Sequence, residues 1–388
     1  MSPSRLNLDV ALGKDLAAIN EAGLLRQMKT VESMQGPEVT LAGRRVLLLC
    51  SNNYLGLASH PRLVEAAREA TARWGTSSVS SRLISGHMQP HEQCERRLAA
   101  WTNTQSALLF STGYQANLSV VTALGGPGDL VVSDQLNHAS IIDGCRLARA
   151  DVAVYDHCDS DHLESILAAN RQRRRVLVIT ETVFSMDGDL APLADISRAC
   201  RRHGAWLVVD EAHASGIFGK RGSGLAEESG IEADVHVGTL GKALGGAAGG
   251  YVAASEDAIA VLEQRARPSL FSNALPATVA CSARKAIEIL ESQPELVSQL
   301  HSNVAVIRAG LANLGFDCPA SPTAIIPIMI GDAADAIQKS ERLLELGVMV
   351  IGFAYPVVPQ GEARLRVQVS AALEESHLEK ILDAFAKL

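Results

Sequence analysis

Short apolar runs alternate with helix-period segments through the middle of the chain. The runs are rich in Val, Leu, Ile and Ala and lack polar alternation, which is typical of strands buried on both faces of a parallel sheet. We predict such strands at residues 107–110, 130–133, 151–155, 176–180, 207–209, 236–238 and 251–253. Between most of them lie predicted helices, at 114–124, 140–148, 160–169 and 193–203. This order predicts an α/β protein whose mainly parallel sheet binds ligands at the carboxyl ends of its strands.

The two ends of the chain carry different patterns. Residues 8–30 have the period of an amphipathic helix, so we predict an N-terminal helical arm over residues 1–45 that packs on the main body or on a partner subunit. A buried strand at 46–50 opens a large domain, 46–276. The remainder predicts a small α+β C-terminal domain, 277–388, with helices at 278–291, 295–314 and 334–346 and strands at 325–330, 348–352 and 365–369.

Composition narrows the function classes. The 388 residues are 47% hydrophobic and only 4% aromatic, so the core is aliphatic, and the net charge of −8 argues against a nucleic-acid surface. We interpret the one basic run, Arg171-Gln-Arg-Arg-Arg175, as a solvated helix end. The seven cysteines are scattered and never form Cys-x-x-Cys, which indicates neither a disulfide framework nor a structural metal site. Without a signal peptide or an apolar run of roughly 20 residues, we expect a soluble cytoplasmic protein.

A lysine, an acid and a histidine follow two of the predicted strands. Lys242 lies in Gly238-Thr-Leu-Gly-Lys-Ala243, in a stretch with no other charge from residue 239 to 254, and Asp210 and His213 end Leu207-Val-Val-Asp-Glu-Ala-His213. A desolvated lysine has a lowered pKa and can form a Schiff base with an aldehyde cofactor. The acid can keep a pyridine nitrogen of that cofactor protonated. Asp-Glu-Ala-His is also a helicase motif, but the chain has no phosphate-binding G-x-x-x-x-G-K-[ST] sequence.

Three further strand ends and one strand of the C-terminal domain carry polar groups, each with a plain structural alternative. Thr112, Gly113 and Tyr114 open a helix and suit a phosphate, or form an ordinary N-cap. His138 can stack on a flat ring, or be a capped loop residue. Ser185 can reach a ring substituent, or belong to a turn. Arg366 can clamp a carboxylate, or point to solvent with Arg364 on the same strand face.

Together these residues lie in an ordered series of motifs that resembles the α-oxoamine synthases, which are pyridoxal-phosphate enzymes of fold type I. The resemblance runs from about residue 51 to the end of the chain. It includes Ser51-Asn-Asn-Tyr-Leu-Gly-Leu57, Ser81-Arg-Leu-Ile-Ser-Gly86, Leu136-Asn-His-Ala-Ser-Ile-Ile-Asp-Gly144, Val183-Phe-Ser-Met-Asp-Gly188, Asp210-Glu-Ala-His213, Gly238-Thr-Leu-Gly-Lys242, Arg267-Pro-Ser-Leu-Phe-Ser-Asn273 and Pro356-Val-Val-Pro359. It implies a three-layer α/β/α domain, a smaller α+β domain and a homodimer with shared active sites.

The resemblance also implies a role for each candidate residue. Lys242 would form the Schiff base with pyridoxal phosphate and later remove the Cα proton of the substrate. The other cofactor contacts would be Asp210 at the ring nitrogen, His213 at the ring oxygen, His138 stacked on the ring, Ser185 and Thr239 beside it, Thr112, Gly113 and Tyr114 at the phosphate, and Ser272 and Asn273 at the phosphate of the neighbouring subunit. Asn52, His138 and Arg366 would hold the amino acid.

The implied activity is the condensation of an amino acid with an acyl-CoA, which releases free CoA. Within the family, Gly238–Gly246, Ser272-Asn273 and residues 324–332 favour the 2-amino-3-ketobutyrate CoA ligases, which use glycine and acetyl-CoA. So do Ala354 and Val357, which replace the arginine and threonine usual in 8-amino-7-oxononanoate synthases. These synthases join alanine to a pimeloyl thioester with loss of CO2, and Ser80-Ser-Arg-Leu-Ile-Ser-Gly86 resembles them instead.

We therefore expect glycine and acetyl-CoA as substrates. The alanine and pimeloyl pair, or another acyl donor in a member of secondary metabolism, remains open. An aminotransferase and a non-catalytic homologue that binds pyridoxal phosphate are more distant alternatives. A lysine and an acid with competent chemistry at the predicted positions favour an enzyme over the non-catalytic homologue.

Overall fold

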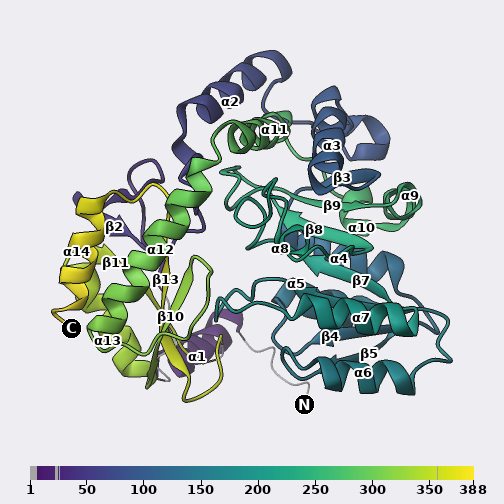
Figure 1. The fold of residues 1–388 in the computed structure, drawn as a ribbon. Coiled ribbons are helices and arrows are strands. Elements are labelled where there is room, and N and C mark those ends of the chain that lie inside the picture. Colours follow the sequence, from purple (N-terminus) through teal and green to yellow (C-terminus); the bar gives the residue numbers. More distant parts are fainter. Residues whose placement is uncertain (1–6, 22–24, 26, 356) are drawn as a thin grey trace.

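A mixed sheet forms the centre of the larger body in this computed structural model, which describes residues 7–21, 25, 27–355 and 357–388 (Figure 1). Its strand order is β3-β9-β8-β7-β6-β4-β5. The strands are β3 (Ser106–Phe110), β4 (Leu130–Asp134), β5 (Asp151–Tyr155), β6 (Val176–Glu181), β7 (Trp206–Asp210), β8 (Val235–Thr239) and β9 (Gly250–Ala254). Only β9 runs antiparallel to its neighbours in this sheet. The seven predicted strands are confirmed to within one residue at each end.

Helices cover both faces of the sheet, which confirms the three-layer prediction. On one face lie α4 (Gly113–Leu124), α5 (Ala139–Leu147) and α9 (Glu256–Arg265). On the other lie α3 (Gln89–Thr102), α6 (Ser160–Ala169), α7 (Leu193–His203) and α11 (Ala277–Ser292). Within β7, Val208 joins the core beneath α4 and α5, whereas Leu207 and Val209 join the opposite core. Because side chains alternate along a strand, Asp210 points to the side of α4 and α5.

Shorter elements complete the larger body. They are the 3-10 turn η1 (Leu57–Ser59), the π-helical turn η2 (Arg82–Gly86), α2 (Pro61–Trp74), α8 (Leu225–Glu228) and α10 (Arg267–Leu270). Helix α2 packs against α11 at the top of Figure 1. The serine-rich segment 75–86, which follows α2, contains η2 at its end.

The C-terminal body contains an antiparallel sheet with the order β10-β13-β12. Its elements are α12 (Glu295–Asn313), β10 (Ile325–Gly331), α13 (Ala333–Glu345), β12 (Ile351–Phe353), β13 (Ala363–Gln368) and α14 (Glu375–Phe385). The single strand predicted at 348–352 is wrong, because the chain changes sheets at the buried Val350. The residues before it form β11 (Val348–Met349) in another sheet, and those after it form β12.

The N-terminal segment joins this smaller body. Strands β1 (Glu38–Leu41) and β2 (Arg44–Leu48) pair with each other, and β2 also pairs in parallel with β11. Strand β2 therefore hydrogen-bonds with β1 and β11 and not with the central sheet. The predicted domain boundaries at residues 45 and 276 stay a prediction. The helix predicted at 8–30 is α1 (Leu8–Glu21). Residues 22–24 and 26 lie outside the described part of the chain, and residues 27–30 are not helical.

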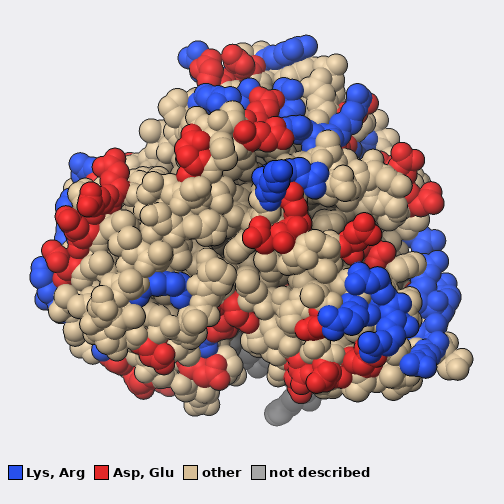
Figure 2. Space-filling model, in the orientation of Figure 1, with Lys and Arg blue, Asp and Glu red and all other residues tan. Residues whose placement is uncertain are grey.

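Charged side chains of both signs are interspersed on the face shown in Figure 2. The basic run 171–175 follows the end of α6, as predicted. Arg173 forms an ion pair with Asp151, and Arg174 forms one with Asp129. These carboxylates neutralise part of the basic run, which fits its interpretation as a solvated helix end.

Candidate active site

The candidate site residues Lys242, Asp210 and His213 meet at the carboxyl edge of the central sheet. Strands β6, β7 and β8 are parallel neighbours that end at Glu181, Asp210 and Thr239. Lys242 lies three residues beyond β8, and His213 lies three residues beyond β7. Carboxyl ends of adjacent parallel strands share one edge, which is the usual ligand edge of such sheets.

Lys242 and His213 are in direct contact. The Lys242 Nζ atom lies 2.8 Å from His213 Nε2. Although part of the lysine side chain lines a cavity, the surrounding protein desolvates its amine. This burial lowers the pKa of Lys242 to about 8, an effect that Asp210 opposes and Arg366 reinforces. At neutral pH a far larger fraction of this amine is unprotonated than in an ordinary lysine, as Schiff-base chemistry requires.

His213 is held from its other side by a buried tyrosine. The His213 Nδ1 atom lies 2.8 Å from the hydroxyl of Tyr54, which in turn donates to Asn52 Oδ1 at 3.2 Å. Burial, together with the charges of Lys242 and Arg366, holds the pKa of His213 well below its usual value. His213 is therefore a neutral imidazole with both nitrogens engaged.

Asp210 has the surroundings of a carboxylate that awaits a cation. Its Oδ2 accepts a hydrogen bond of 2.6 Å from Asn117 Nδ2, and its Oδ1 accepts one of 2.8 Å from the backbone N–H of Ala212. Asp210 belongs to none of the ion pairs found among the described residues. Each oxygen has only one donor, so room remains for a charged N–H donor.

His138 is the N-cap residue of α5. Its Nδ1 accepts from the backbone N–H of Ser140 at 3.2 Å and so caps α5. The ring of Tyr114 lies edge-on to it, with 6.2 Å between centroids. Burial lowers the pKa of His138, while Asp210 raises it and Lys242 lowers it. The capping histidine thus also belongs to the charged cluster around Lys242.

The start of α4 lies next to the end of β8. Thr112 caps the helix by accepting from the backbone N–H of Gln115 at 3.1 Å. A Cβ on Gly113 would lie 3.3 Å from Cβ of Thr239, so a larger residue would require Thr239 to shift by a few tenths of an ångström. The Thr239 hydroxyl donates to the carbonyl of Gly249 at 3.1 Å. The N-terminus of α4 thus has backbone N–H groups and the hydroxyls of Thr112 and Thr239 close together, as a phosphate site requires.

Arg366 is buried, so the predicted alternative of a solvent-facing strand is wrong. Arg364 and Arg366 expose only 2% and 8% of their surface. Arg364 pairs with Asp187, whereas none of the ion pairs among the described residues includes Arg366, whose Nε has no hydrogen-bond partner there. Burial lowers the pKa of Arg366. A buried guanidinium without a carboxylate is suited to an anionic ligand.

The remaining predicted residues are less closely tied to this cluster. Ser185 is half-buried in the turn after β6 and makes no hydrogen bond with the described residues. Ser272 is half-buried, and its hydroxyl donates to the carbonyl of Asn273 at 3.2 Å. That carbonyl also accepts from Ser111 at 3.2 Å, so this segment lies beside the start of α4 in its own chain.

Sequence reasoning missed four residues that shape the site, namely Tyr54, Asn117, Glu181 and Gln368. The Gln368 amide contacts both Asn52 and Tyr54. Period-two alternation along β13, which singled out Arg366, would also have found Gln368. Glu181 would have followed from listing every acid at the end of a buried strand. Asn117 lies within α4 and gives no signal, because its partner Asp210 is 93 residues away.

Lys242 and Asn52 line a cavity of about 760 Å³, which also contains Gly241, Gly245 and Met349. This volume lies within the range of small-molecule sites. A larger cavity, of about 980 Å³, lies at the opposite edge of the sheet near Trp206 and His236. We place the chemistry in the smaller cavity, because it contains the buried amine and lies at the carboxyl ends of the strands.

The chain is similar to known proteins over nearly its whole length. The family of class I and II aminotransferases matches residues 44–385. Proteins named 8-amino-7-oxononanoate synthase from Anaeromyxobacter dehalogenans and Geobacter sulfurreducens are each 46% identical, covering 97% of this chain and 94% and 97% of their own lengths. The chain belongs to the pyridoxal-phosphate-dependent α-oxoamine synthases. A serine palmitoyltransferase structure from S. paucimobilis, described with a bound PLP–myriocin aldimine, is 30% identical, with a TM-score of 0.93 over 98% of each chain.

Membership in this family confirms the predicted fold type I architecture, the cofactor and the class of enzyme, a C-acyltransferase that uses pyridoxal phosphate. The substrates of α-oxoamine synthases are an amino acid and an acyl thioester. Among the described residues, no helix combines the length and the apolar character needed to span a membrane.

The residues of this α-oxoamine synthase fit its cofactor. Lys242 offers a desolvated amine for the aldehyde, and Asp210 offers a buried carboxylate for the ring nitrogen. Gly113 and Thr239 adjoin a helix N-terminus that suits the phosphate. The buried Nε–H of Arg366 has no hydrogen-bond partner among the described residues, which suits this side chain to an anionic group such as a carboxylate.

Proposed function

We propose that this α-oxoamine synthase joins alanine to a pimeloyl thioester, releasing CO2 and the free thiol, as an 8-amino-7-oxononanoate synthase. The observation that carries the proposal is the 46% identity, across 97% of this chain, to relatives with that name. Glycine with acetyl-CoA, the substrate pair expected from the sequence motifs, is not confirmed, and the comparisons favour the alternative. Ala354 and Val357 therefore do not by themselves indicate a short acyl chain.

In this proposal the chain's own groups bind the amino acid and move its proton. Arg366 and Asn52 hold the carboxylate, and His138 covers the reacting face. Pyridoxal phosphate, when bound, withdraws electrons from Cα of the amino acid. Lys242 Nζ takes the Cα proton, a role supported by its lowered pKa of about 8. Asp210 keeps the ring nitrogen charged, and neutral His213 orients Lys242 across their 2.8 Å contact.

The proposal also includes Thr112, Gly113, Tyr114, Ser185 and Thr239 as cofactor contacts. Ser272 and Asn273 serve the site of a second subunit. A homodimer is supported by exposed apolar side chains, since Phe271 beside Ser272 is 73% exposed and α1 has no buried residue. A cytoplasmic location suits the seven cysteines, all of which are free thiols.

Thiol release from paired substrates tests this function. The purified holoenzyme is mixed with alanine, glycine or serine, each with pimeloyl-CoA, acetyl-CoA or palmitoyl-CoA, and thiol and CO2 are measured together. We expect thiol and CO2 in equal amounts with alanine and pimeloyl-CoA, and at least tenfold less thiol with the other pairs. A preference for glycine and acetyl-CoA, or for serine and palmitoyl-CoA, would overturn the substrate assignment.

A Lys242→Ala variant provides the control for catalysis. It keeps Asp210 and the start of α4, but it has neither the Schiff-base amine nor the proposed base. We expect thiol release to fall to the background of buffer. A variant that released thiol at the wild-type rate would contradict the role of Lys242.

A further inference from the structure

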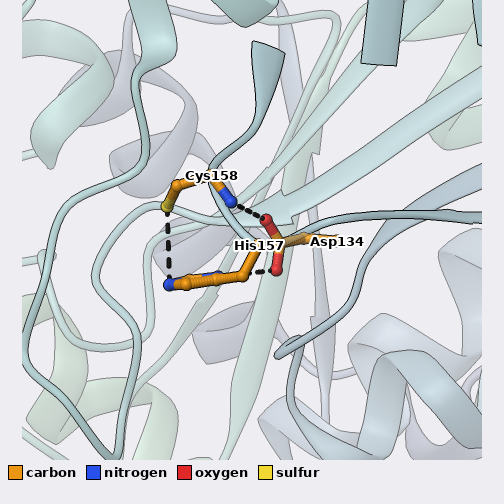
Figure 3. A group of neighbouring side chains, drawn as sticks. All are labelled: Asp134, His157 and Cys158. Atoms are coloured by element: carbon orange, nitrogen blue, oxygen red, sulfur yellow. Dashed lines mark hydrogen bonds and ion pairs between the residues drawn. The ribbon is translucent and has the colours of Figure 1, made fainter. Parts of the chain in front are cut away.

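Four ligand-type side chains gather beside the active site without a role in the proposed reaction. Asp134 ends β4, His157 and Cys158 follow β5, and Asp189 lies beyond β6. Figure 3 shows Asp134, His157 and Cys158 turned toward one another at this edge of the sheet. Aspartate, histidine and cysteine are common metal ligands, so either a metal ion or a set of hydrogen bonds could hold these side chains together.

The imidazole of His157 lies between two carboxylates. Its Nδ1 is 2.9 Å from Asp134 Oδ1, and its Nε2 is 2.7 Å from Asp189 Oδ2. An ionised carboxylate only accepts hydrogen bonds, so both ring nitrogens donate and the ring carries a positive charge. Burial by itself would lower the pKa of His157, but hydrogen bonds with Asp134 and Asp189 raise it to about 12.

A proton therefore explains this cluster better than a metal ion does. A metal would need the lone pair of His157 Nε2, which is occupied by the N–H bond directed at Asp189. Both oxygens of Asp134 are already used as well, since Oδ1 accepts from the backbone N–H of Leu136 and Oδ2 accepts from that of Cys158, each at 2.9 Å.

The charged ring connects two loops that reach the active site. Asp134 begins the turn that leads to Asn137 and His138, and Asn137 Nδ2 donates to the carbonyl of Ile179 at 2.8 Å. Asp189 closes the loop that carries Ser185, because its carbonyl accepts from the backbone N–H of Phe184 at 3.0 Å. The Phe184 ring packs edge-on against His157, with 4.4 Å between centroids.

The second loop also reaches the smaller body. Asp187 pairs with Arg364, and the carbonyl of Gly188 accepts from the Thr323 hydroxyl at 2.7 Å. Arg364 lies two residues before Arg366 on β13, so the loop fixed by His157 supports the strand that carries the proposed carboxylate ligand. A shift of this loop would affect cofactor contacts and substrate contacts together.

We propose that His157 is a positioning residue whose doubly hydrogen-bonded ring holds the loops of His138 and Ser185 in register around the cofactor. The inference rests on the proposed roles of those two residues. It does not depend on which acyl thioester the enzyme uses. His157 touches neither reactant, and it acts through Asp134 on one loop and through Asp189 on the other.

A His157→Gln variant tests this inference, because glutamine can reach one carboxylate but cannot carry the charge or bridge both. A matched control is His162→Gln, which removes a histidine whose Nδ1 accepts from the backbone N–H of Asp156 and lies near only one carboxylate among the described residues, the exposed one of Asp156. The dissociation constant of pyridoxal phosphate and the visible circular dichroism of the bound cofactor are measured without substrate. We expect the dissociation constant to rise about tenfold and the dichroism to weaken in His157→Gln, with both unchanged in the control.

Activity separates positioning from substrate binding. Misplacement of catalytic groups by about 1 Å can cost on the order of 100-fold in rate, so we expect kcat to fall 10- to 100-fold in His157→Gln, more than KM changes. A lower melting temperature with unchanged dichroism and kcat would overturn the proposal and make His157 purely structural. One zinc ion per purified chain, whose removal by a chelator reproduces the variant, would overturn it in favour of a metal site.

A milder variant covers the case in which His157→Gln does not fold. Asp189→Asn keeps the backbone carbonyl of residue 189 and the Asp134–His157 pair, but removes one of the two charges. We expect a smaller change in the same direction for cofactor dissociation and dichroism. Wild-type values for both quantities in Asp189→Asn would contradict the proposal. Failure of the substrate assignment would leave all of these substrate-free results unchanged, so the two hypotheses can fail separately.

Discussion

Glu181 and Asp210 lie directly opposite each other on adjacent parallel strands and form a pair of buried carboxyl groups at the site. Their exposures are 3% and 4%. Asp210 accepts two hydrogen bonds, whereas Glu181 Oε1 has no partner among the described residues. Burial and the neighbouring Asp210 raise the pKa of Glu181 well above its usual value, although Lys242 lowers it. Glu181 is therefore the neutral member of the pair and Asp210 the charged one.

A Glu181→Gln variant should therefore resemble the wild type. Glutamine keeps the size and the neutrality of a protonated glutamate, so we expect the free energy of unfolding to change by less than about 1 kcal/mol. The visible absorbance of the bound cofactor should titrate at the wild-type pH. Urea unfolding and a spectrophotometric pH titration check both expectations.

Glu181→Leu is the contrasting variant. It removes the carboxyl group that the backbone N–H of His138 faces, and an unsatisfied buried donor costs about 1–3 kcal/mol of stability. A Glu181→Gln variant that moved the cofactor titration by a full pH unit would show that Glu181 is ionised, contrary to our assignment.

The sequence predicted which residues gather at the carboxyl edge of the central sheet better than it predicted the strands of the smaller body. Lys242, Asp210 and His213 follow strands buried on both faces, where continuous apolar runs mark both the strand and its end. The prediction of one strand at 348–352 failed because β11 and β12 are very short. So few residues show no pattern that would reveal the change of sheet at Val350. Tyr54 reaches His213 across 159 residues, and no local period carries that contact.

The lowered pKa of Lys242 predicts that its amine destabilises the apoenzyme at neutral pH. The folded protein loses this proton near pH 8, whereas the unfolded chain loses it near 10.5. Below pH 8 both states are protonated and the full cost is present. Between pH 8 and 10.5 the unfolded state binds more protons, so stability rises by up to about 1.4 kcal/mol per pH unit from this group.

A Lys242→Met variant isolates that contribution. We expect apo Lys242→Met to be more stable than the apo wild type at pH 7, by an amount on the order of a few kcal/mol, and the difference to shrink toward pH 10.5. Urea unfolding of both proteins at pH 7, 9 and 10.5 measures the difference, in which the other titrating groups largely cancel. A difference that stayed constant from pH 7 to 10.5 would contradict the lowered pKa.

Arg366→Lys tests the carboxylate ligand. Lysine keeps a charge but loses the planar pair of donors, and charged hydrogen bonds contribute about 1.5–3 kcal/mol. We therefore expect KM for the amino acid to rise roughly 10- to 100-fold, with little change in KM for the acyl thioester. Steady-state kinetics with each substrate varied in turn provide the measurement.

Arg364→Lys is the matched control for that experiment, because Arg364 is equally buried on the same strand but pairs with Asp187. We expect it to lower the melting temperature and to raise KM for the amino acid far less than Arg366→Lys does. Equal effects of the two substitutions on KM would mean that Arg366 acts through the strand rather than on the carboxylate.

Tyr54→Phe should uncouple His213 from its support. The substitution removes the hydroxyl 2.8 Å from His213 Nδ1 and leaves a buried nitrogen without a partner, which costs about 1–3 kcal/mol. Tyr155→Phe provides the comparison, because the buried hydroxyl of Tyr155 has no partner among the described residues and its loss should be nearly neutral. Urea unfolding compares the stabilities of the two variants. A pH titration of the bound cofactor should shift only in Tyr54→Phe, because of these two tyrosines Tyr54 is the one that contacts His213, which in turn contacts Lys242. Equal losses of stability and no shift in either titration would show that Tyr54 contributes packing alone.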